Sequence, residues 1–294
     1  MHRHFLTEAG SAKEPRSSKN ALAVAVLALG WAASIGMVQA QGLKLPPGGA
    51  GPPPGAPGAP QAPSTGKAAA PFDLTGQWVS LVTRDWQYRM VVPGRGEYQG
   101  LPLNLAGKQR ADAWDPKVDE KAGNQCAPYG AGVVMLVPER LRIDWLDDET
   151  LQVQTDAGMQ TRVLRFKPGA DATSSPASRQ GQSKASWLMH VTSDPGLGGL
   201  VVDEGQFGAL KITTGNMLAG LLRKNGVAYS EHSDLTEYWD VQQDPVSKKE
   251  YLIVTASLRD PDLLNANYNY VATFERESAG SKWDPTPCSL TTAP

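Results

Sequence analysis

Apolar and polar residues alternate with a period of two over much of residues 78–274, a spacing typical of β-strands. The first alternating segment runs from Trp78 to Met90 and predicts one long strand. Residues 141–166 predict three more strands, joined by turns at residues 147–149 and 156–158. Strands joined by such short turns are typical of an antiparallel sheet. Further strands are expected at residues 186–192, 208–213, 235–241, 251–258 and 268–274.

Helical periodicity is scarce in this sequence. Residues 105–114 and 216–226 each predict a short helix, the second ending at Gly226. The strand–helix–strand alternation that builds parallel sheets is missing from the pattern. We therefore expect an all-β fold, an antiparallel barrel with one or two short helices, because closure removes the exposed edges of a sheet.

The N-terminal segment has a different pattern. Basic residues precede an apolar stretch at residues 21–38, and Val38-Gln39-Ala40 follows the small-x-small pattern of a cleavage site. This order predicts a signal peptide over residues 1–40, a periplasmic or secreted location, and no stable membrane insertion after cleavage. A retained membrane anchor is the alternative, because an apolar segment of about 18 residues approaches the length that spans a bilayer.

Residues 41–71 are rich in proline, glycine and alanine and contain few large side chains. Such a segment buries too little apolar surface to offset the entropy of the chain, so it predicts a disordered linker. Residues 72–294 then have a suitable length for a single β-barrel domain.

The net charge and the two cysteines limit the classes of partner that we expect and indicate the state of the thiols. The formal net charge is −2, so we expect no surface for nucleic acid. In an exported protein the two cysteines, Cys126 and Cys288, are expected to form a disulfide. A reactive thiol or a pair of metal ligands is the alternative, but neither cysteine lies in a CxxC motif or beside a histidine. We expect no metal site and no cofactor.

Glu237 is the first candidate for chemistry, because it shares a strand face with Leu235, Trp239 and Val241. A carboxylate on an apolar face is costly unless it is paired or protonated. We expect an internal ion pair, with Arg84 as the partner. Contact with a ligand and general acid–base catalysis are the other two interpretations.

Three residues of the first predicted strand and one histidine complete the set of candidates. Arg84, Trp86 and Tyr88 share a face toward one end of that strand, and aromatic groups beside a polar group suit the lining of a ligand cavity. Ordinary core packing is the alternative for the two aromatic residues. His232 precedes the strand of Glu237 and is either a surface residue or a proton carrier. The adjacent Arg223 and Lys224 are expected to be a solvated charge pair.

Two resemblances support the fold and export. Gly76-x-Trp78 resembles the opening of lipocalins and other calycins, which implies a calycin-like barrel with the tryptophan packed at its closed base. The chain also resembles a widespread set of secreted bacterial proteins without a settled activity. The segments that carry this likeness include Asp73-Leu-Thr-Gly-x-Trp, Cys126-x-x-Tyr-Gly, Leu222-Arg-Lys-Asn-Gly-Val-x-Tyr-Ser and Ser281-Lys-Trp-Asp-Pro-Thr-Pro-Cys.

Three functions are compatible with these patterns. The first is an exported protein that binds a small, largely apolar or aromatic molecule in a barrel cavity, through Arg84, Trp86, Tyr88 and Glu237. The second is a cofactor-free isomerase, hydratase or lyase, in which Glu237 or His232 moves a proton and Arg84 stabilises negative charge. The third is a structural protein of the cell envelope.

Overall fold

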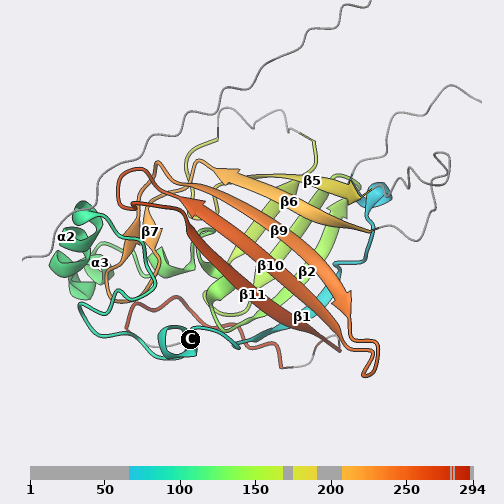
Figure 1. Cartoon of the computed structure of the whole chain (residues 1–294), viewed down its shortest axis with the longest axis horizontal. Coiled ribbons are helices and arrows are strands. Elements are labelled where there is room, and N and C mark those ends of the chain that lie inside the picture. The colour runs from blue at the N-terminus through green and yellow to red at the C-terminus, as the bar shows by residue number, and fades with distance from the viewer. Residues whose placement is uncertain (1–65, 168–174, 191–206, 279, 281, 292–294) are drawn as a thin grey trace, which may run out of the picture. The chain divides into compact units, whose positions relative to one another are not determined.

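The computed structural model describes residues 66–167, 175–190, 207–278, 280 and 282–291. Among these residues, nine strands close into a barrel in the order β1-β11-β10-β9-β6-β5-β4-β3-β2 (Figure 1). The expected all-β barrel is therefore confirmed. The strands are β1 (Gly76–Leu81), β2 (Arg140–Asp147), β3 (Thr150–Thr155), β4 (Thr161–Arg165), β5 (Gln182–His190), β6 (Phe207–Gly215), β9 (Asp234–Gln243), β10 (Glu250–Arg259) and β11 (Tyr268–Glu277).

Neighbouring strands of the barrel pair antiparallel, except that β4 and β5 pair parallel over a short stretch. The meander predicted for residues 141–166 is present as β2, β3 and β4. β5 therefore runs beside β4 in the same direction, and a connecting segment of residues 166–181 separates the two strands in sequence. Its residues 168–174 lie outside the described residues.

Short helices and a small second sheet lie beside the barrel. The helices are η1 (Gly66–Ala69), α1 (Trp86–Arg89), α2 (Leu105–Ala113), α3 (Pro116–Lys121), η2 (Ala127–Tyr129) and η3 (Val134–Leu136). The helix predicted at 105–114 is α2, whose first turn is capped by the side chain of Asn104 accepting from Gly107 N at 2.8 Å. In Figure 1, α2, α3 and β7 lie together at one end of the barrel.

The prediction of a second helix at residues 216–226 is wrong. The chain there forms β7 (Gly220–Leu221) and β8 (Ala228–Tyr229), which pair antiparallel. Gly226 has a φ of +91° and lies in the turn between them. A Cβ at this position would lie 2.5 Å from the Cβ of Trp114, so glycine serves a tight turn here and not a helix end.

The prediction of one long strand from Trp78 to Met90 is also wrong, because β1 ends at Leu81. Asp85 takes a left-handed conformation with φ of +55°, which aspartate tolerates better than most residues, and α1 follows it. Over so few residues, a period of two does not exclude a helical turn. The consequence is that Arg84 and Trp86 are exposed to solvent, the latter with 61% of its surface.

Alternate residues of the strands point inward and fill the barrel. The largest of the fully buried side chains on the strands include Trp78, Trp239, Arg162 and Phe274. Trp78 is fully buried: its Nε1 donates to Leu74 O at 3.0 Å, and the guanidinium of Arg276 lies 4.1 Å from the ring centroid. The first strand is thereby tied to the last.

The packed chain begins before the expected boundary at residue 72. Gly66 is buried, and its carbonyl accepts a hydrogen bond from Trp187 Nε1 at 2.7 Å. The next residue, Lys67, donates its main-chain N–H to Asp148 O. The expected signal peptide at 1–40 and most of the linker at 41–71 lie outside the described residues. Within the described ranges, no helix has the length and apolar character required to cross a membrane.

The segment from η2 to η3 packs on the barrel end where β2 and β11 begin. Its residues Gly130 and Gly132 lie against the ring of the buried Tyr229. A Cβ on Gly130 would lie 2.2 Å from Tyr229 Oη. Any larger residue would displace this segment, which forms one wall of the pocket described next.

Candidate functional site

A pocket lies at this barrel end, between segments that are distant in sequence. Its walls come from α1 and the residues after it, from η2 and η3, from the turn between β7 and β8, and from the first residue of β11. Its empty volume is about 640 Å³, which includes the part open to solvent. Valine, leucine and proline side chains form most of the apolar wall, and Tyr88 and Tyr268 add two aromatic rings.

Arg223 and Tyr88 form a stacked pair in this pocket. The guanidinium carbon lies 4.0 Å from the centroid of the Tyr88 ring. Arg223 donates to two main-chain carbonyls, Gln99 O at 2.8 Å and Glu97 O at 3.4 Å. Only 9% of its surface is exposed, and burial lowers the pKa of its guanidinium. Arg223 is therefore a fixed part of the pocket and not half of a solvated charge pair.

The pocket has an excess of positive charge. Its lining includes three cationic side chains, Arg89, Arg223 and Lys224, against one carboxylate, Asp85. Arg89, like Arg223, is held by neutral acceptors: Leu136 O at 2.7 Å and Ser80 Oγ at 3.2 Å. A partly desolvated cluster with this charge favours an anionic group on any molecule that enters.

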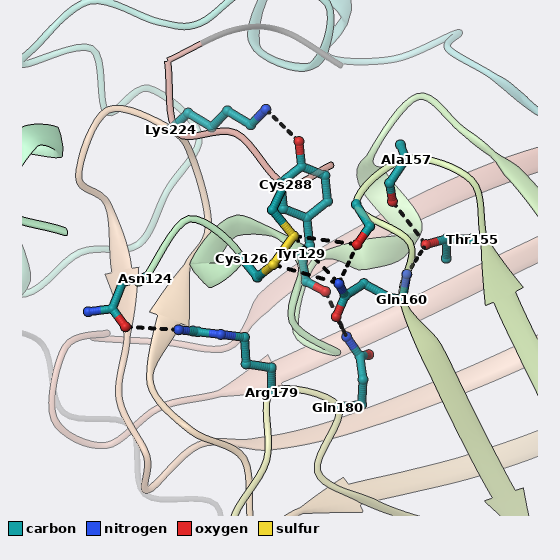
Figure 2. The surroundings of a disulfide bond; sticks show 11 residues. Asn124, Cys126, Tyr129, Thr155, Ala157, Gln160, Arg179, Gln180, Lys224 and Cys288 are labelled. Carbon is teal, nitrogen blue, oxygen red and sulfur yellow. Dashed lines mark hydrogen bonds between the residues drawn. A yellow bond between two sulfur atoms is a disulfide. The ribbon is translucent and has the colours of Figure 1, made fainter. Parts of the chain in front are cut away.

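Lys224 contacts Tyr129 beside the disulfide (Figure 2). Its Nζ donates to Tyr129 Oη at 3.0 Å and lies 5.0 Å from the centroid of the ring. Burial lowers the pKa of Lys224 from its usual 10.5 to about 8. A fraction of the amine is therefore neutral near physiological pH. The neutral form is the one that can act as a base or nucleophile.

The structure places Glu237 inside the barrel, away from this pocket. Its carboxylate forms a two-pronged ion pair with Arg162 of β4, with Nη2 to Oε2 at 2.6 Å and Nη1 to Oε1 at 3.1 Å. Both side chains are fully buried. Trp239 Nε1 also donates to Glu237 Oε1, at 3.4 Å. The partner is thus Arg162 and not the expected Arg84, which is exposed.

Arg162 is the residue that sequence reasoning missed. It alternates with Leu164 on β4 and with Phe166 directly after this strand, and all three side chains are buried. A charged residue on an apolar strand face was the same signal that singled out Glu237. Two such residues of opposite charge in one barrel would have predicted the pair.

Of the four residues expected to contact a ligand, the structure places Tyr88 in the pocket. Arg84 and Trp86 are exposed and do not line it, and Glu237 has no exposed surface. The aromatic-plus-arginine arrangement is nevertheless present, with Arg223 in the place expected for Arg84.

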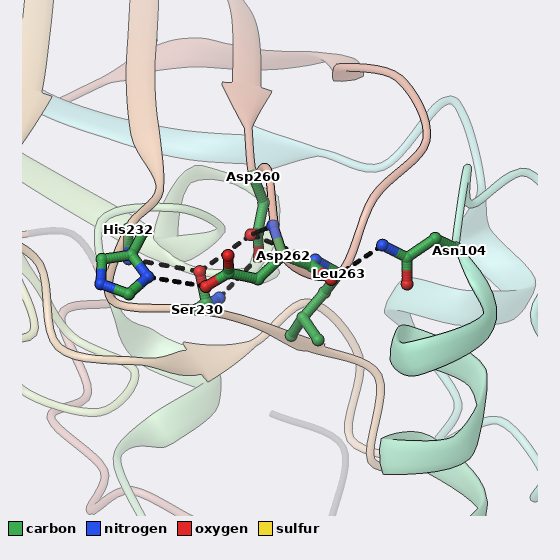
Figure 3. Close-up of polar contacts among 6 residues, drawn as sticks. All are labelled: Asn104, Ser230, His232, Asp260, Asp262 and Leu263. Carbon is green, nitrogen blue, oxygen red and sulfur yellow. Dashed lines mark hydrogen bonds and ion pairs between the residues drawn. The ribbon is translucent and has the colours of Figure 1, made fainter.

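His232 lies on an exposed loop and not beside Glu237. Its Nδ1 contacts Asp262 Oδ2 at 2.7 Å, and this hydrogen bond raises the pKa of the imidazole. The buried Asp260 accepts from the main-chain N–H and the hydroxyl of Ser230, at 2.6 Å and 2.8 Å, which joins the loop before β9 to the loop after β10 (Figure 3). His232 and Glu237 therefore cannot contact one substrate in this arrangement.

The expected disulfide is confirmed. Cys126 and Cys288 are bonded, with their Cα atoms 5.0 Å apart. The side chain of Gln160 lies against both sulfur atoms, as Figure 2 shows, at 3.9 Å and 3.5 Å. The bond fixes the C-terminal segment to the start of η2. The described residues contain no cluster of three or more histidine, cysteine, aspartate or glutamate side chains that could hold a metal ion.

Glu139 is a buried carboxyl group that the sequence did not single out. It precedes β2, is 5% exposed, and neither carboxyl oxygen has a hydrogen-bond partner among the described residues. Burial, followed by the negative charge of Asp156, raises its pKa well above the usual range, although Arg162 and Arg89 oppose the shift. The proton is thus retained at pH values where an exposed glutamate is ionised.

We expect Glu139→Gln to gain stability over the natural protein as pH rises from 4 to 8. Below the pKa of the unfolded chain, at about 4.3, both side chains are neutral and the proteins differ least. Above it, the unfolded natural chain ionises, whereas the folded chain must keep the proton or bury a charge. The difference in unfolding free energy should therefore grow by about 1 kcal/mol or more. Urea unfolding at pH 4, 6 and 8 measures it, with the exposed Glu231→Gln as control, and a difference that does not change with pH would contradict the assignment.

No family model, no curated protein and no solved structure matches this chain.

Proposed function

We propose that this is an exported barrel protein that binds a small, largely apolar or aromatic molecule with an acidic group, in the pocket between α1 and the β7–β8 turn. One observation carries the proposal: Arg223 is nearly buried, stacked on Tyr88, and held in place by main-chain carbonyls. An arginine held in this way has its position fixed before a ligand arrives, so little side-chain entropy is lost on binding.

The walls of the pocket support an aromatic ligand. Tyr88 and Tyr268 provide ring surfaces, and Val92, Pro93 and Leu222 provide apolar surface beside them. Pockets that bind small molecules commonly combine such walls with a few fixed polar groups. A planar acid would place its ring against the apolar wall and its carboxylate near Arg223.

Export is supported by two features. The Cys126–Cys288 disulfide is stable in oxidising compartments and rare in the cytosol. The sequence of residues 1–40 follows the pattern of a signal peptide. The proposed location is therefore the periplasm or the exterior of the cell, in agreement with the resemblance to secreted bacterial proteins.

Two substitutions on α1 test the site. Tyr88→Leu is expected to weaken the binding of 2-naphthoate, a simple aromatic acid, about five- to tenfold, because the ring that orients Arg223 is lost. Trp86→Leu removes an aromatic ring from the same helix outside the pocket and should change the dissociation constant less than twofold. Isothermal titration calorimetry of both variants measures this. Equal losses in the two variants would show that the pocket is not the binding site.

A further inference from the structure

Lys224 lies where two pockets meet. The pocket of Tyr88 and Arg223 shares Val92, Pro93 and Lys224 with a second pocket, which is also lined by Trp114 and Arg95. A molecule bound in either pocket therefore lies beside the same amine. The β7–β8 turn, closed by Gly226, holds this lysine in place.

The hydroxyl group beside this amine is fixed. Tyr129 is 2% exposed, and its ring packs so closely on Gly158 that a Cβ there would lie 2.4 Å from Tyr129 Cδ1. The disulfide at Cys126 anchors the start of η2, which carries Tyr129 (Figure 2). The contact of 3.0 Å between Lys224 Nζ and Tyr129 Oη is therefore held by rigid elements.

The electrostatic surroundings favour a reactive amine. Burial lowers the pKa of Lys224 to about 8 and raises that of Tyr129, so near neutral pH the phenol keeps its proton while a minor fraction of the amine is neutral. The charged groups that line the two pockets with Lys224 are Asp85, Arg89, Arg223 and Arg95. Positive charge predominates among them, whereas the lowered pKa of Lys224 comes from burial.

We propose that Lys224 captures ligands that carry an aldehyde or ketone as an imine, with Tyr129 as the proton donor. This inference rests on the proposed function, because the carbonyl compound must enter the same pocket. A buried lysine with a fixed proton donor beside it is the arrangement that amine catalysis of carbonyl chemistry requires. It would also supply the cofactor-free proton transfer that Glu237 and His232 cannot provide together.

The step balances without a further reactant. The lone pair of the neutral Lys224 Nζ forms a bond to the carbonyl carbon, and the nitrogen passes one of its two protons to the carbonyl oxygen, which becomes a hydroxyl group. Tyr129 then donates its proton to this hydroxyl, the carbon–oxygen bond breaks, and water leaves as the carbon–nitrogen double bond forms. The nitrogen then passes its second proton to the oxygen of Tyr129, which returns to its neutral state. The net change is amine plus carbonyl to imine plus water.

The test traps the imine on the full chain. The protein is incubated with 4-formylbenzoate, and cyanoborohydride supplies the hydride that reduces the imine to a stable amine. Peptide mapping by mass spectrometry should find the adduct on Lys224 at least tenfold above any other lysine. The trapping rate should rise with pH through about 8, as the amine of Lys224 loses its proton.

Three variants make the outcome decisive. Lys224→Arg keeps the positive charge and should abolish the selective adduct, whereas Lys184→Arg, at an exposed position of β5, should leave it unchanged. Tyr129→Phe should lower the trapping rate about a hundredfold, the lower end of the usual contribution of a general acid or base. Adducts spread evenly over the lysines, or a selective adduct that survives Lys224→Arg, would overturn the inference.

Terephthalate separates failure of this inference from failure of the proposed function. It has the shape of the aldehyde probe and carries two carboxylates, but it forms no imine. If calorimetry shows that terephthalate binds and no selective adduct forms, the pocket binds acids and the imine chemistry is wrong. If neither terephthalate nor 2-naphthoate binds and no adduct forms, both proposals are wrong.

Discussion

Glu237→Ala is expected to destabilise the protein by about 3–5 kcal/mol, the largest single-residue effect that we foresee. The substitution leaves the guanidinium of Arg162 fully buried without its counter-ion. Both side chains of this doubly hydrogen-bonded pair are fully buried, so the guanidinium that remains cannot be solvated by water. Guanidinium chloride unfolding of the two proteins measures the difference.

A variant that lacks both charges separates two contributions to the free energy of unfolding: the cost of one unpaired buried charge and the net stabilisation by the ion pair. The double variant Arg162→Met/Glu237→Leu should recover most of the loss, because apolar residues of similar volume commonly replace a buried pair at little cost. Glu231→Ala, on the exposed loop before β9, should change stability by less than about 0.5 kcal/mol. A double variant as unstable as Glu237→Ala would contradict this interpretation.

Loss of the disulfide is expected to cost about 2–5 kcal/mol. The bond joins residues separated by 162 positions, for which the chain-entropy model gives about 5 kcal/mol. The variant Cys126→Ala/Cys288→Ala and the reduced natural protein should lose similar amounts in thermal or denaturant unfolding. An unchanged melting temperature in both would show that packing of the C-terminal segment suffices without the bond.

Removal of the disulfide should also affect the pocket. Cys126 immediately precedes η2, and this element contributes Pro128 to the pocket and Tyr129 to the contact with Lys224. When the C-terminal segment is released, the position of Tyr129 is less constrained. We therefore expect the double cysteine variant to bind 2-naphthoate more weakly, even at a temperature where it is folded.

Local patterns predicted most of the strands, because inward and outward residues of a half-buried strand alternate along the chain. The meander of β2 to β4 and the three C-terminal strands follow directly from such alternation. The pattern was insufficient between Leu81 and Met90, where Asp85 in a left-handed conformation turns the chain into α1. It was also insufficient at 216–226, where apolar residues line a two-stranded turn.

The partner of Glu237 could not be read from local patterns for a different reason. Arg162 on β4 reaches Glu237 on β9 across two intervening strands. The hydroxyl groups of Ser183 on β5 and Thr214 on β6 lie 2.8 Å apart, and Thr214 also contacts Arg162, so a polar row crosses the interior over four adjacent strands. Only the closed strand order brings these residues together.

The pocket depends even more on the three-dimensional arrangement. Tyr88, Arg223 and Tyr268 come from three segments far apart in sequence, and none of them forms a motif with the others. Tyr88 was found because an aromatic residue near an arginine is a recognisable pattern. Arg223 beside Lys224 looks like a solvated pair in the sequence, and only its main-chain acceptors and its burial show otherwise.

The most direct test of the central claim is calorimetric titration of 2-naphthoate and its neutral analogue 2-naphthalenemethanol into the natural protein and Arg223→Gln. If the pocket selects aromatic acids through Arg223, the acid should bind the natural protein at least tenfold more tightly than the alcohol, as a hydrogen bond to a charged group is worth about 1.5–3 kcal/mol. The substitution should remove most of that preference and leave the weak binding of the alcohol. Equal affinities for the two compounds in the natural protein, or no binding of either, would contradict the claim.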